Sequence, residues 1–386
     1  MRLFLDYRPA LKDRTGVGEW VHQLARTILG LKRAGDPLAN GVEVILFSSS
    51  RRDRPDPAAL ADLPGASLVD RHVPVRLLNA AWYKLGWPPV EQVCAQRFDV
   101  VQSTNPVLLP ARGGLRAVTI YDLDFYHHPE RAWGEMRADF PSLVQSHARR
   151  ADLIVTISEY SAGEIRQHLA VEPEQILVCR PGVPEWIAET RTAPLEPGDG
   201  GYILFVGTLE PRKNVPGLLN AYERLLARHP GAPRLVLAGR PTPAADAWIA
   251  RAASPAFKGR IDIRGYVGVA ERAGLYQGAR MLVLPSFDEG FGLPALEAMA
   301  LGIPVVVSTR GALPEVIGGA GLLIEPDEAE GLCEAMRRIW QDPGVAGTLR
   351  DAGLIQAARF SWQDSARALL AGYRDGLARR SRAESS

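Results

Sequence analysis

A glycine-rich turn between an apolar run and a helix is contained in Met281-Leu-Val-Leu-Pro-Ser-Phe-Asp-Glu-Gly-Phe-Gly-Leu-Pro-Ala-Leu-Glu-Ala-Met299. The run that ends at Leu284 has the length and composition of a buried parallel strand. Gly290 and Gly292 let the backbone approach a ligand closely, and Pro294 suits the start of a helix. Free N–H groups at such a start, together with the helix dipole, favour a phosphate. The stretch therefore predicts an anion site.

Two glutamates bracket this predicted anion site. Glu289 precedes the turn, and Glu297 lies in the first helical turn, eight residues later. Carboxylates are poor partners for phosphate but accept hydrogen bonds from sugar hydroxyls. We therefore interpret the stretch as a pocket for a sugar nucleotide. The alternative is that both acids only stabilise the N-terminal end of a helix, which is worth about 0.3–1 kcal/mol.

A second strand and loop carry two adjacent cations. In Phe205-Val-Gly-Thr-Leu-Glu-Pro-Arg-Lys-Asn-Val215, Gly207 follows the apolar run, and Arg212 and Lys213 come just before a helix. Arginine offers a planar fork and lysine a point charge, and the two together suit a diphosphate. A solvated pair at a helix start is the alternative, but cations there oppose the helix dipole.

Short runs rich in Val, Ile, Leu and Phe recur along the chain between longer amphipathic segments, as in parallel sheets with crossover helices. Pro and Gly concentrate in residues 180–201, which places a domain boundary near 185–200. We expect two doubly wound α/β domains, residues 1–190 and 191–360, with the ligand in the cleft where strand ends face each other. A capping box at Ser361-Trp-Gln-Asp364 predicts a C-terminal helix in residues 361–386 that packs back on the first domain and ends in a frayed tail. The expected strands are 2–6, 42–47, 99–103, 117–121, 153–157, 176–179, 202–206, 234–238, 261–264, 281–284, 305–308 and 321–324.

Composition excludes several classes of protein. The 386 residues are 46% hydrophobic and 23% charged, so the chain builds cores and is not disordered. Its formal net charge of +1 argues against a nucleic-acid partner. The three cysteines lack disulfide or zinc spacing, and no apolar run reaches the roughly 18 residues of a membrane span. We expect a cytoplasmic protein.

The two stretches quoted above, with Arg264-Gly-Tyr-Val267 and Gly311-Ala-Leu-Pro-Glu-Val316, resemble the donor half of the retaining glycosyltransferases of family 4. The first half also resembles that family, in Asp13-Arg-Thr-Gly-Val-Gly18 and in Ala117-Val-Thr-Ile-Tyr-Asp122 with His128-Pro-Glu130. The resemblance implies the GT-B fold, in which two Rossmann-like domains face a central cleft. It makes the first domain the acceptor side and the second the donor side.

The resemblance implies a role for each matching residue. Arg212 and Lys213 correspond to the pair that binds the donor diphosphate and stabilises the leaving group. Glu289 and Glu297 form the family's Glu-x7-Glu signature, with Glu289 on the donor sugar and Glu297 on the ribose. In the family, backbone N–H groups at positions matching Gly290, Phe291, Gly292 and Leu293 bind phosphate or sugar. The backbone of the segment matching Arg264, Gly265, Tyr266 and Val267 contacts the nucleobase. The remaining residues implied in substrate binding are Gly16, Gly18, Tyr121 and Gly207.

One residue departs from the family pattern. The family often has His before the acid that matches Asp122, and this chain has Tyr121. We assign Asp122 a polar contact to the donor sugar or the acceptor. The alternative is that Tyr121 and Asp122 merely end a strand and start a turn.

No metal or cofactor is expected. Asp122-Leu-Asp124 spells a DxD pattern, but Arg212 and Lys213 already supply the charge that a metal would bring, so we expect metal-independent transfer. Gly16-Val-Gly18 lacks the third glycine of a dinucleotide fingerprint.

The family implies hexosyl transfer, with mannose ahead of glucose, from a GDP- or UDP-hexose to a saccharide or lipid-linked saccharide in the synthesis of cell-surface polysaccharide. A non-catalytic nucleotide-sugar-binding module and a sugar-nucleotide epimerase are the alternatives. Residues 71–87 mix cations with Trp82, Tyr83 and Trp87. That mixture is compatible with peripheral membrane contact, and also with buried helix packing beside snorkelling cations.

Overall fold

The structure is a computed structural model of the chain, and it forms two compact units. Unit 1 comprises Met1–Gly182 and Ser361–Ser386, and unit 2 comprises Val183–Phe360. The boundary expected between residues 190 and 191 lies outside the described residues. The structure describes residues 1–386 except 12–15, 52, 130–138, 188–200, 258 and 385–386.

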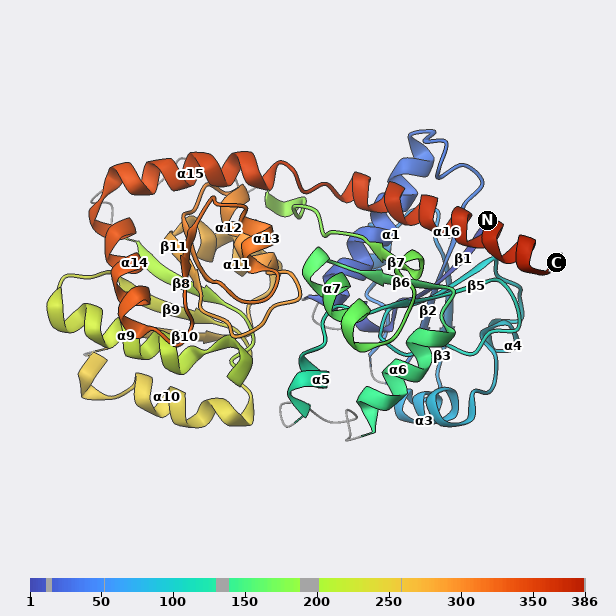
Figure 1. The fold of residues 1–386 in the computed structure, drawn as a ribbon, viewed down its shortest axis with the longest axis horizontal. Coiled ribbons are helices and arrows are strands. Elements are labelled where there is room, and N and C mark those ends of the chain that lie inside the picture. The colour runs from blue at the N-terminus through green and yellow to red at the C-terminus, as the bar shows by residue number, and fades with distance from the viewer. Residues whose placement is uncertain (12–15, 52, 130–138, 188–200, 258, 385–386) are drawn as a thin grey trace. The chain divides into compact units, whose positions relative to one another are not determined.

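Unit 1 is built on a seven-stranded parallel sheet in the order β3-β2-β1-β4-β5-β6-β7 (Figure 1). The order reverses between β1 and β4, the kind of switch point at which open α/β sheets bind ligands. Strand β3 was not predicted, because it is an edge strand with exposed or half-buried residues and no apolar run. The strands are β1 (Arg2–Asp6), β2 (Glu43–Ser49), β3 (Ser67–Arg71), β4 (Val100–Ser103), β5 (Leu115–Thr119), β6 (Leu153–Thr156) and β7 (Ile176–Val178).

The helices of unit 1 bury apolar faces against this sheet and against one another. In α1, Trp20, Leu24 and Ile28 follow the spacing of one helix face and are buried. The helices are α1 (Val17–Arg33), α2 (Pro57–Ala61), α3 (Val75–Ala80), α4 (Val90–Cys94), α5 (Asp124–His127), α6 (Phe140–Arg150), α7 (Glu159–His168) and α16 (Trp362–Glu384), with shorter turns at η1 (Arg8–Ala10), η2 (Ala81–Leu85) and η4 (Pro173–Gln175).

The C-terminal helix α16 contacts α1, β5 and β6 of unit 1 (Figure 1). Asp364 N donates to Ser361 Oγ at 3.3 Å, as a cap does. The helix extends to Glu384, beyond the start of the frayed tail expected from the sequence. Arg380 Nη1 pairs with Asp152 Oδ2 at 3.2 Å, and cations near a helix C-terminus are favoured by its dipole.

Unit 2 is built on a six-stranded parallel sheet in the order β10-β9-β8-β11-β12-β13. Its strands are β8 (Tyr202–Val206), β9 (Arg234–Ala238), β10 (Ile261–Gly265), β11 (Ala279–Leu284), β12 (Val305–Ser308) and β13 (Leu322–Ile324). Its helices are α9 (Val215–Arg228), α10 (Asp246–Ala252), α11 (Val269–Gln277), α12 (Leu293–Ala300), α13 (Leu313–Ile317), α14 (Ala329–Gln341) and α15 (Pro343–Ala357), with shorter turns at η5 (Pro211–Lys213), η6 (Pro243–Ala245) and η7 (Pro255–Phe257).

Both sheets are parallel and doubly wound, which confirms the predicted α/β class. Because β8 and β11 are neighbours in unit 2, the loops that follow them begin side by side at one edge of the sheet. In the part of the chain that the structure describes, none of the helices combines the length and apolar character needed to span a bilayer.

Candidate active site

The loops after β8 and β11 are fastened to each other by their backbones and by one buried side chain. Phe287 N donates to Arg212 O at 2.8 Å. Asn214 Nδ2 donates to Pro285 O at 3.1 Å and to Pro326 O at 2.8 Å. Asn214 Oδ1 also caps α9 by accepting from the backbone. Sequence reasoning missed Asn214, although an Asn just before a helix is a signal for a cap.

Lys213, Arg212 and Glu289 meet at this edge of the sheet. Lys213 Nζ lies 2.5 Å from Glu289 Oε1, and Arg212 Nη1 lies 3.9 Å from Glu289 Oε2. Ser286 Oγ donates to the same Oε1 at 2.8 Å. Burial raises the pKa of Glu289, but the charges of Lys213 and Arg212 and the hydrogen bonds from Lys213 and Ser286 outweigh it. The pKa therefore lies below its ordinary value, and the buried carboxyl is ionised at neutral pH.

Each cation of this pair already has an acidic partner in its own unit. Arg212 Nη2 lies 3.1 Å from Glu210 Oε1, and Arg212 Nη1 donates to Asp288 O at 3.4 Å. Lys213 is paired with Glu289. The two cations and the two carboxylates balance in charge, which the sequence did not predict. A diphosphate at this position would have to share the cations with Glu210 and Glu289.

Glycines allow the start of α12 to approach these loops. Gly292 precedes the helix with a φ of 104°, and a Cβ there would lie 2.6 Å from Leu313 Cδ2. Gly311 has a φ of 64°, and a Cβ there would lie 2.5 Å from Glu289 N. Ala312 N donates to Glu289 O at 2.8 Å. The loop after β12 therefore holds the backbone of Glu289 against the start of α12.

Glu297 is held by a different set of side chains, which sequence reasoning missed. It is buried on α12, and Tyr276 OH donates to Glu297 Oε2 at 2.7 Å. Arg272 Nη2 lies 3.6 Å from Glu297 Oε1, and the Arg272 guanidinium lies 5.3 Å from the Trp186 ring centroid. Burial, together with the charge of Glu297, raises the pKa of Tyr276 well above its ordinary value, so this phenol remains a donor.

The segment predicted to meet a nucleobase lies at the end of β10. Gly239 N donates to Gly265 O at 2.7 Å, which ties this end to the end of β9. Arg264 Nε pairs with Asp262 Oδ2 at 2.8 Å on the same strand. The Arg240 guanidinium lies 5.5 Å from the ring centroid of the exposed Tyr266, and Val267 is buried. The predicted donor-side residues therefore all lie in unit 2, at or just beyond the carboxyl edge of its sheet.

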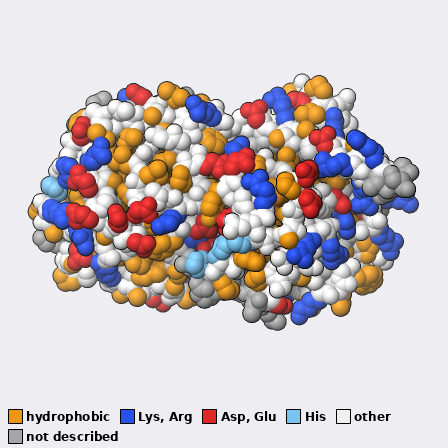
Figure 2. Space-filling view, in the orientation of Figure 1, with side chains coloured by type: hydrophobic (Ala, Val, Ile, Leu, Met, Phe, Trp, Pro, Cys, Tyr) orange, Lys and Arg blue, Asp and Glu red, His pale blue; other side chains and the backbone are white. Residues whose placement is uncertain are grey.

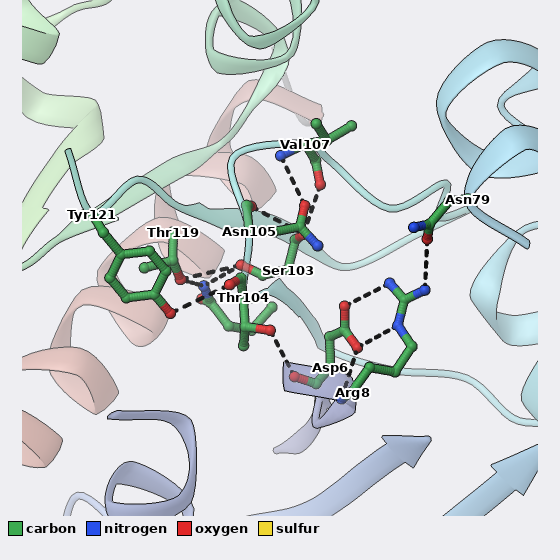
Figure 3. Close-up of polar contacts among 10 residues, drawn as sticks. Asp6, Arg8, Asn79, Ser103, Thr104, Asn105, Val107, Thr119 and Tyr121 are labelled. Carbon is green, nitrogen blue, oxygen red and sulfur yellow. Dashed lines mark hydrogen bonds and ion pairs between the residues drawn. The ribbon is translucent and has the colours of Figure 1, made fainter. Parts of the chain in front are cut away.

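Four of the predicted site residues lie in unit 1, namely Gly16, Gly18, Tyr121 and Asp122. Tyr121 OH donates to Thr104 O at 3.3 Å (Figure 3). Burial raises the pKa of Tyr121 well above its ordinary value, so the phenol stays protonated at neutral pH. Asp122 Oδ1 accepts from Asp124 N at 3.3 Å, so both acids of the DxD pattern take part in a turn.

The glycine loop of unit 1 is described from Gly16 onward, because Asp13-Arg-Thr15 lies outside the described residues. Gly16 precedes α1 with a φ of 50°, and a Cβ on Gly18 would lie 2.6 Å from Pro9 O. The residue at the end of the second first-half motif, Glu130, also lies outside the described residues. Close packing against η1 accounts for Gly18 without a ligand.

A buried ion pair at the end of β1 was missed by sequence reasoning. Arg8 Nη2 lies 2.7 Å from Asp6 Oδ2, Arg8 Nε donates to Asp6 Oδ1 at 2.7 Å, and Arg8 Nη1 donates to Asn79 Oδ1 at 2.8 Å (Figure 3). Thr104 Oγ1 donates to Asp6 O at 2.7 Å and joins this pair to the backbone next to Tyr121. The signal was an acid directly after the apolar run of β1.

Two family models together match most of the chain. Residues 16–185 match the family model "Glycosyltransferase Family 4", and residues 200–342 match "Glycosyl transferases group 1". The chain is 32% identical over 268 residues to an O-antigen chain mannosyltransferase B of Escherichia coli, a match that covers 66% of this chain and 69% of that protein. This chain belongs to the family 4 glycosyltransferases.

Other known proteins resemble this glycosyltransferase in sequence or in fold. An MMP alpha-(1->4)-mannosyltransferase of Mycolicibacterium hassiacum is 31% identical over 245 residues, 62% of this chain but only 58% of that protein. The sucrose-phosphate synthase of Thermosynechococcus elongatus superposes with a TM-score of 0.73 at 21% identity, over 100% of this chain and 99% of its own. With two Rossmann-like sheets, the glycosyltransferase has the GT-B fold that the sequence resemblance implied.

Proposed function

We propose that this glycosyltransferase moves a hexose, mannose in the first place and glucose next, from a nucleoside-diphosphate sugar to a saccharide or lipid-linked saccharide in the synthesis of cell-surface polysaccharide. The main support is the contact of Lys213 and Arg212 with the buried Glu289 beside the start of α12. The preference for mannose is supported by two relatives named mannosyltransferases, one of them for the O-antigen chain.

The chemistry that these residues would serve is the departure of a diphosphate from an anomeric carbon. Negative charge develops on the leaving phosphate, and preorganised cations and N–H groups stabilise it. Lys213 and Arg212 would supply the cations, and the start of α12 the N–H groups. Glu289, ionised and already oriented by Lys213 and Ser286, would accept from hydroxyls of the donor sugar. Glu297 would accept from the ribose hydroxyls.

Retention of configuration and independence from metal belong to the same proposal. With the acceptor hydroxyl attacking the face that the diphosphate leaves, the departing phosphate would take the hydroxyl proton. The new glycosidic bond forms as the bond to phosphate breaks, so charge and atoms balance without a protein nucleophile. The cations replace a divalent ion as the partner of the leaving group.

A panel of sugar nucleotides tests the proposal. The chain is incubated with GDP-mannose, GDP-glucose, UDP-glucose and UDP-galactose, with and without saccharide acceptors and with and without excess chelator. We expect diphosphate release from a mannosyl donor, faster with an acceptor and unchanged by chelator. Loss of release in chelator that Mg²⁺ or Mn²⁺ restores would contradict metal independence. Binding without release would indicate a non-catalytic module, and an isomerised sugar nucleotide would indicate an epimerase; each would overturn the transferase proposal.

We also propose that the acceptor side of unit 1 touches an anionic membrane surface. Trp82 is buried in the core, but Leu77, Leu85 and Trp87 are 65%, 75% and 59% exposed. The exposed cations Arg76 and Lys84 lie on the same segment, α3 and η2. Apolar side chains beside cations suit an interface of anionic lipid. We expect the chain to float with anionic liposomes at low salt, and we expect the Leu85→Ser variant to float less. Absence of flotation at low salt would contradict the proposed membrane contact.

A further inference from the structure

A cluster of two imidazoles and one carboxylate lies in unit 1, apart from the residues used above. It consists of His127 at the end of α5 and of Glu164 and His168 on α7. Figure 2 shows histidine side chains gathered on the face of the molecule where Figure 1 places α5 and α7. Sequence analysis assigned no role to His127, and its partners lie more than thirty residues further along the chain.

The ligand atoms of these three residues lie close together. His127 Nε2 lies 2.5 Å from Glu164 Oε2, and His168 Nε2 lies 3.8 Å from the same oxygen. All three atoms lie within 4.8 Å of one another. Bonds to zinc of about 2.0–2.1 Å in tetrahedral geometry put ligand atoms roughly 3.3 Å apart. The observed distances lie on both sides of that value, so small side-chain rotations would bring the atoms to it.

The local structure positions the three side chains before any ion binds. Glu164 and His168 are four residues apart on α7, so they share one helix face. The ring of Tyr126 packs against both imidazoles, with centroids 5.7 Å from His127 and 5.4 Å from His168. The two imidazole rings are themselves 4.8 Å apart and nearly perpendicular. The side chains of His127, Glu164 and His168 are 35%, 20% and 24% exposed, so all three are partly accessible to solvent.

We propose that His127 Nε2, Glu164 Oε2 and His168 Nε2 form a zinc site with water in the fourth position. Two imidazole nitrogens and one carboxylate oxygen are a ligand set that suits Zn²⁺, whereas Mg²⁺ and Ca²⁺ prefer oxygen alone. A bound ion would join α5, which follows β5, to α7, which follows β6. Its role is to fasten these two neighbouring elements of unit 1. The inference does not rest on the proposed function.

Zinc titration of the full chain tests the site. The chain is freed of metal with chelator, and Zn²⁺ binding is followed by calorimetry and by the melting temperature. We expect about one Zn²⁺ per chain and a rise in melting temperature. Glu164→Gln and His168→Ala should each weaken binding by at least about 10-fold, since even residues that only support a ligand change affinity by about 10–100-fold. His72→Ala, which removes an exposed histidine elsewhere in unit 1, should bind as the original chain does.

Visible absorption with cobalt is a second measurement of metal binding, and it does not depend on the variants. Co²⁺ added to the metal-free original chain should produce visible absorption bands that Zn²⁺ abolishes. Folding of each variant is checked by circular dichroism without metal, and His168→Gln replaces His168→Ala if the latter unfolds. No stoichiometric binding to the original chain, or binding that is equal in Glu164→Gln, His168→Ala and the original, would overturn the proposal. These readouts are affinity and melting temperature, so they stand whether or not the transferase proposal holds.

Discussion

At the scale of single residues, charge is balanced inside the candidate site. Glu289 forms ion pairs with Lys213 and Arg212, and Glu210 forms a second ion pair with Arg212. A buried carboxylate without such partners would take up a proton, because burial disfavours its charged form. The pair of cations therefore keeps Glu289 ionised, and Glu289 keeps the Lys213 ammonium in a fixed position. A phosphate arriving at the site would meet oriented charges.

Removing either cation should slow the chemical step. If leaving-group stabilisation dominates, Lys213→Ala and Arg212→Ala should each lower kcat by on the order of 10²-fold or more. The measurement is the initial rate of transfer at saturating donor. Arg224→Ala is the matched control, since Arg224 is an exposed arginine of unit 2 paired with Glu330. Near-normal kcat in both site variants would refute the assignment.

Replacing Glu289 should change the pH dependence of stability. Its folded pKa lies below the ordinary value of 4.5, so its contribution is complete above that pH and is lost as pH falls through the folded pKa. Glu289→Gln should lower the free energy of unfolding at pH 7 by about 3 to 5 kcal/mol, the typical cost of breaking a buried pair. The difference between the two proteins should shrink below pH 4.5, as urea unfolding at several pH values would reveal. A difference that is constant with pH would contradict the ion pair.

At the scale of elements, the site depends on how closely the loops after β8, β11 and β12 approach one another. Asn214 bonds the β8 loop to Pro285 and Pro326, and Gly311 lies against the backbone of Glu289. These contacts set the distance between the cations and the start of α12. The glycines here are needed for backbone approach, which is a steric requirement that holds with or without a ligand.

A methyl group at Gly311 should therefore displace Glu289. Gly311→Ala puts a Cβ 2.5 Å from Glu289 N at a positive φ, and both effects cost free energy. We expect a loss of about 1–3 kcal/mol in stability, measured by urea unfolding, and weaker binding of nucleoside diphosphate. Gly274→Ala in α11 meets no atom within 4 Å and should be neutral or slightly stabilising. Equal behaviour of the two variants would contradict the close approach.

The sequence predicted the elements better than the contacts between side chains. Apolar runs located the buried strands, but β3 lacks such a run and was missed. The sequence placed Arg212 and Lys213 in one loop after a strand and Glu289 in another, but their contact follows from the pairing of β8 with β11, which only the structure gives. The hydrogen bond from Tyr276 and the ion pair from Arg272 to Glu297 could not be predicted, since they depend on how α11 packs against α12. The buried Asp6–Arg8 ion pair likewise could not be predicted, because it depends on the three-dimensional fold.

At the scale of the whole molecule, the chain returns to unit 1 after completing unit 2. Helix α16 buries Ala366, Leu369, Leu370 and Tyr373, and Tyr373 OH donates to Gln102 Oε1 at 2.9 Å. The capping box at Ser361 predicted this helix, but the sequence did not predict that the helix extends to Glu384. The stability of unit 1 therefore depends on a helix that follows unit 2 in the chain.

Loss of packing between α16 and its neighbours should destabilise unit 1 and leave the stability of unit 2 unchanged. Leu370→Ala removes a fully buried side chain and should cost about 2–5 kcal/mol. Hydrogen exchange followed by mass spectrometry should show faster exchange in β5, β6 and α1, with unit 2 unchanged. Ile355→Ala, at a side chain 66% exposed in unit 2, should leave both units nearly unaffected. Equally faster exchange in unit 2 would contradict the assignment of α16 to unit 1.

The most direct measurement is a crystal structure of the full chain with a bound nucleoside diphosphate. We predict phosphate oxygens within hydrogen-bond distance of Lys213 Nζ or the Arg212 guanidinium and of N–H groups at the start of α12, with the ribose near Glu297. A diphosphate bound elsewhere, or Lys213, Arg212, Glu289 and Glu297 all turned away from it, would contradict the account.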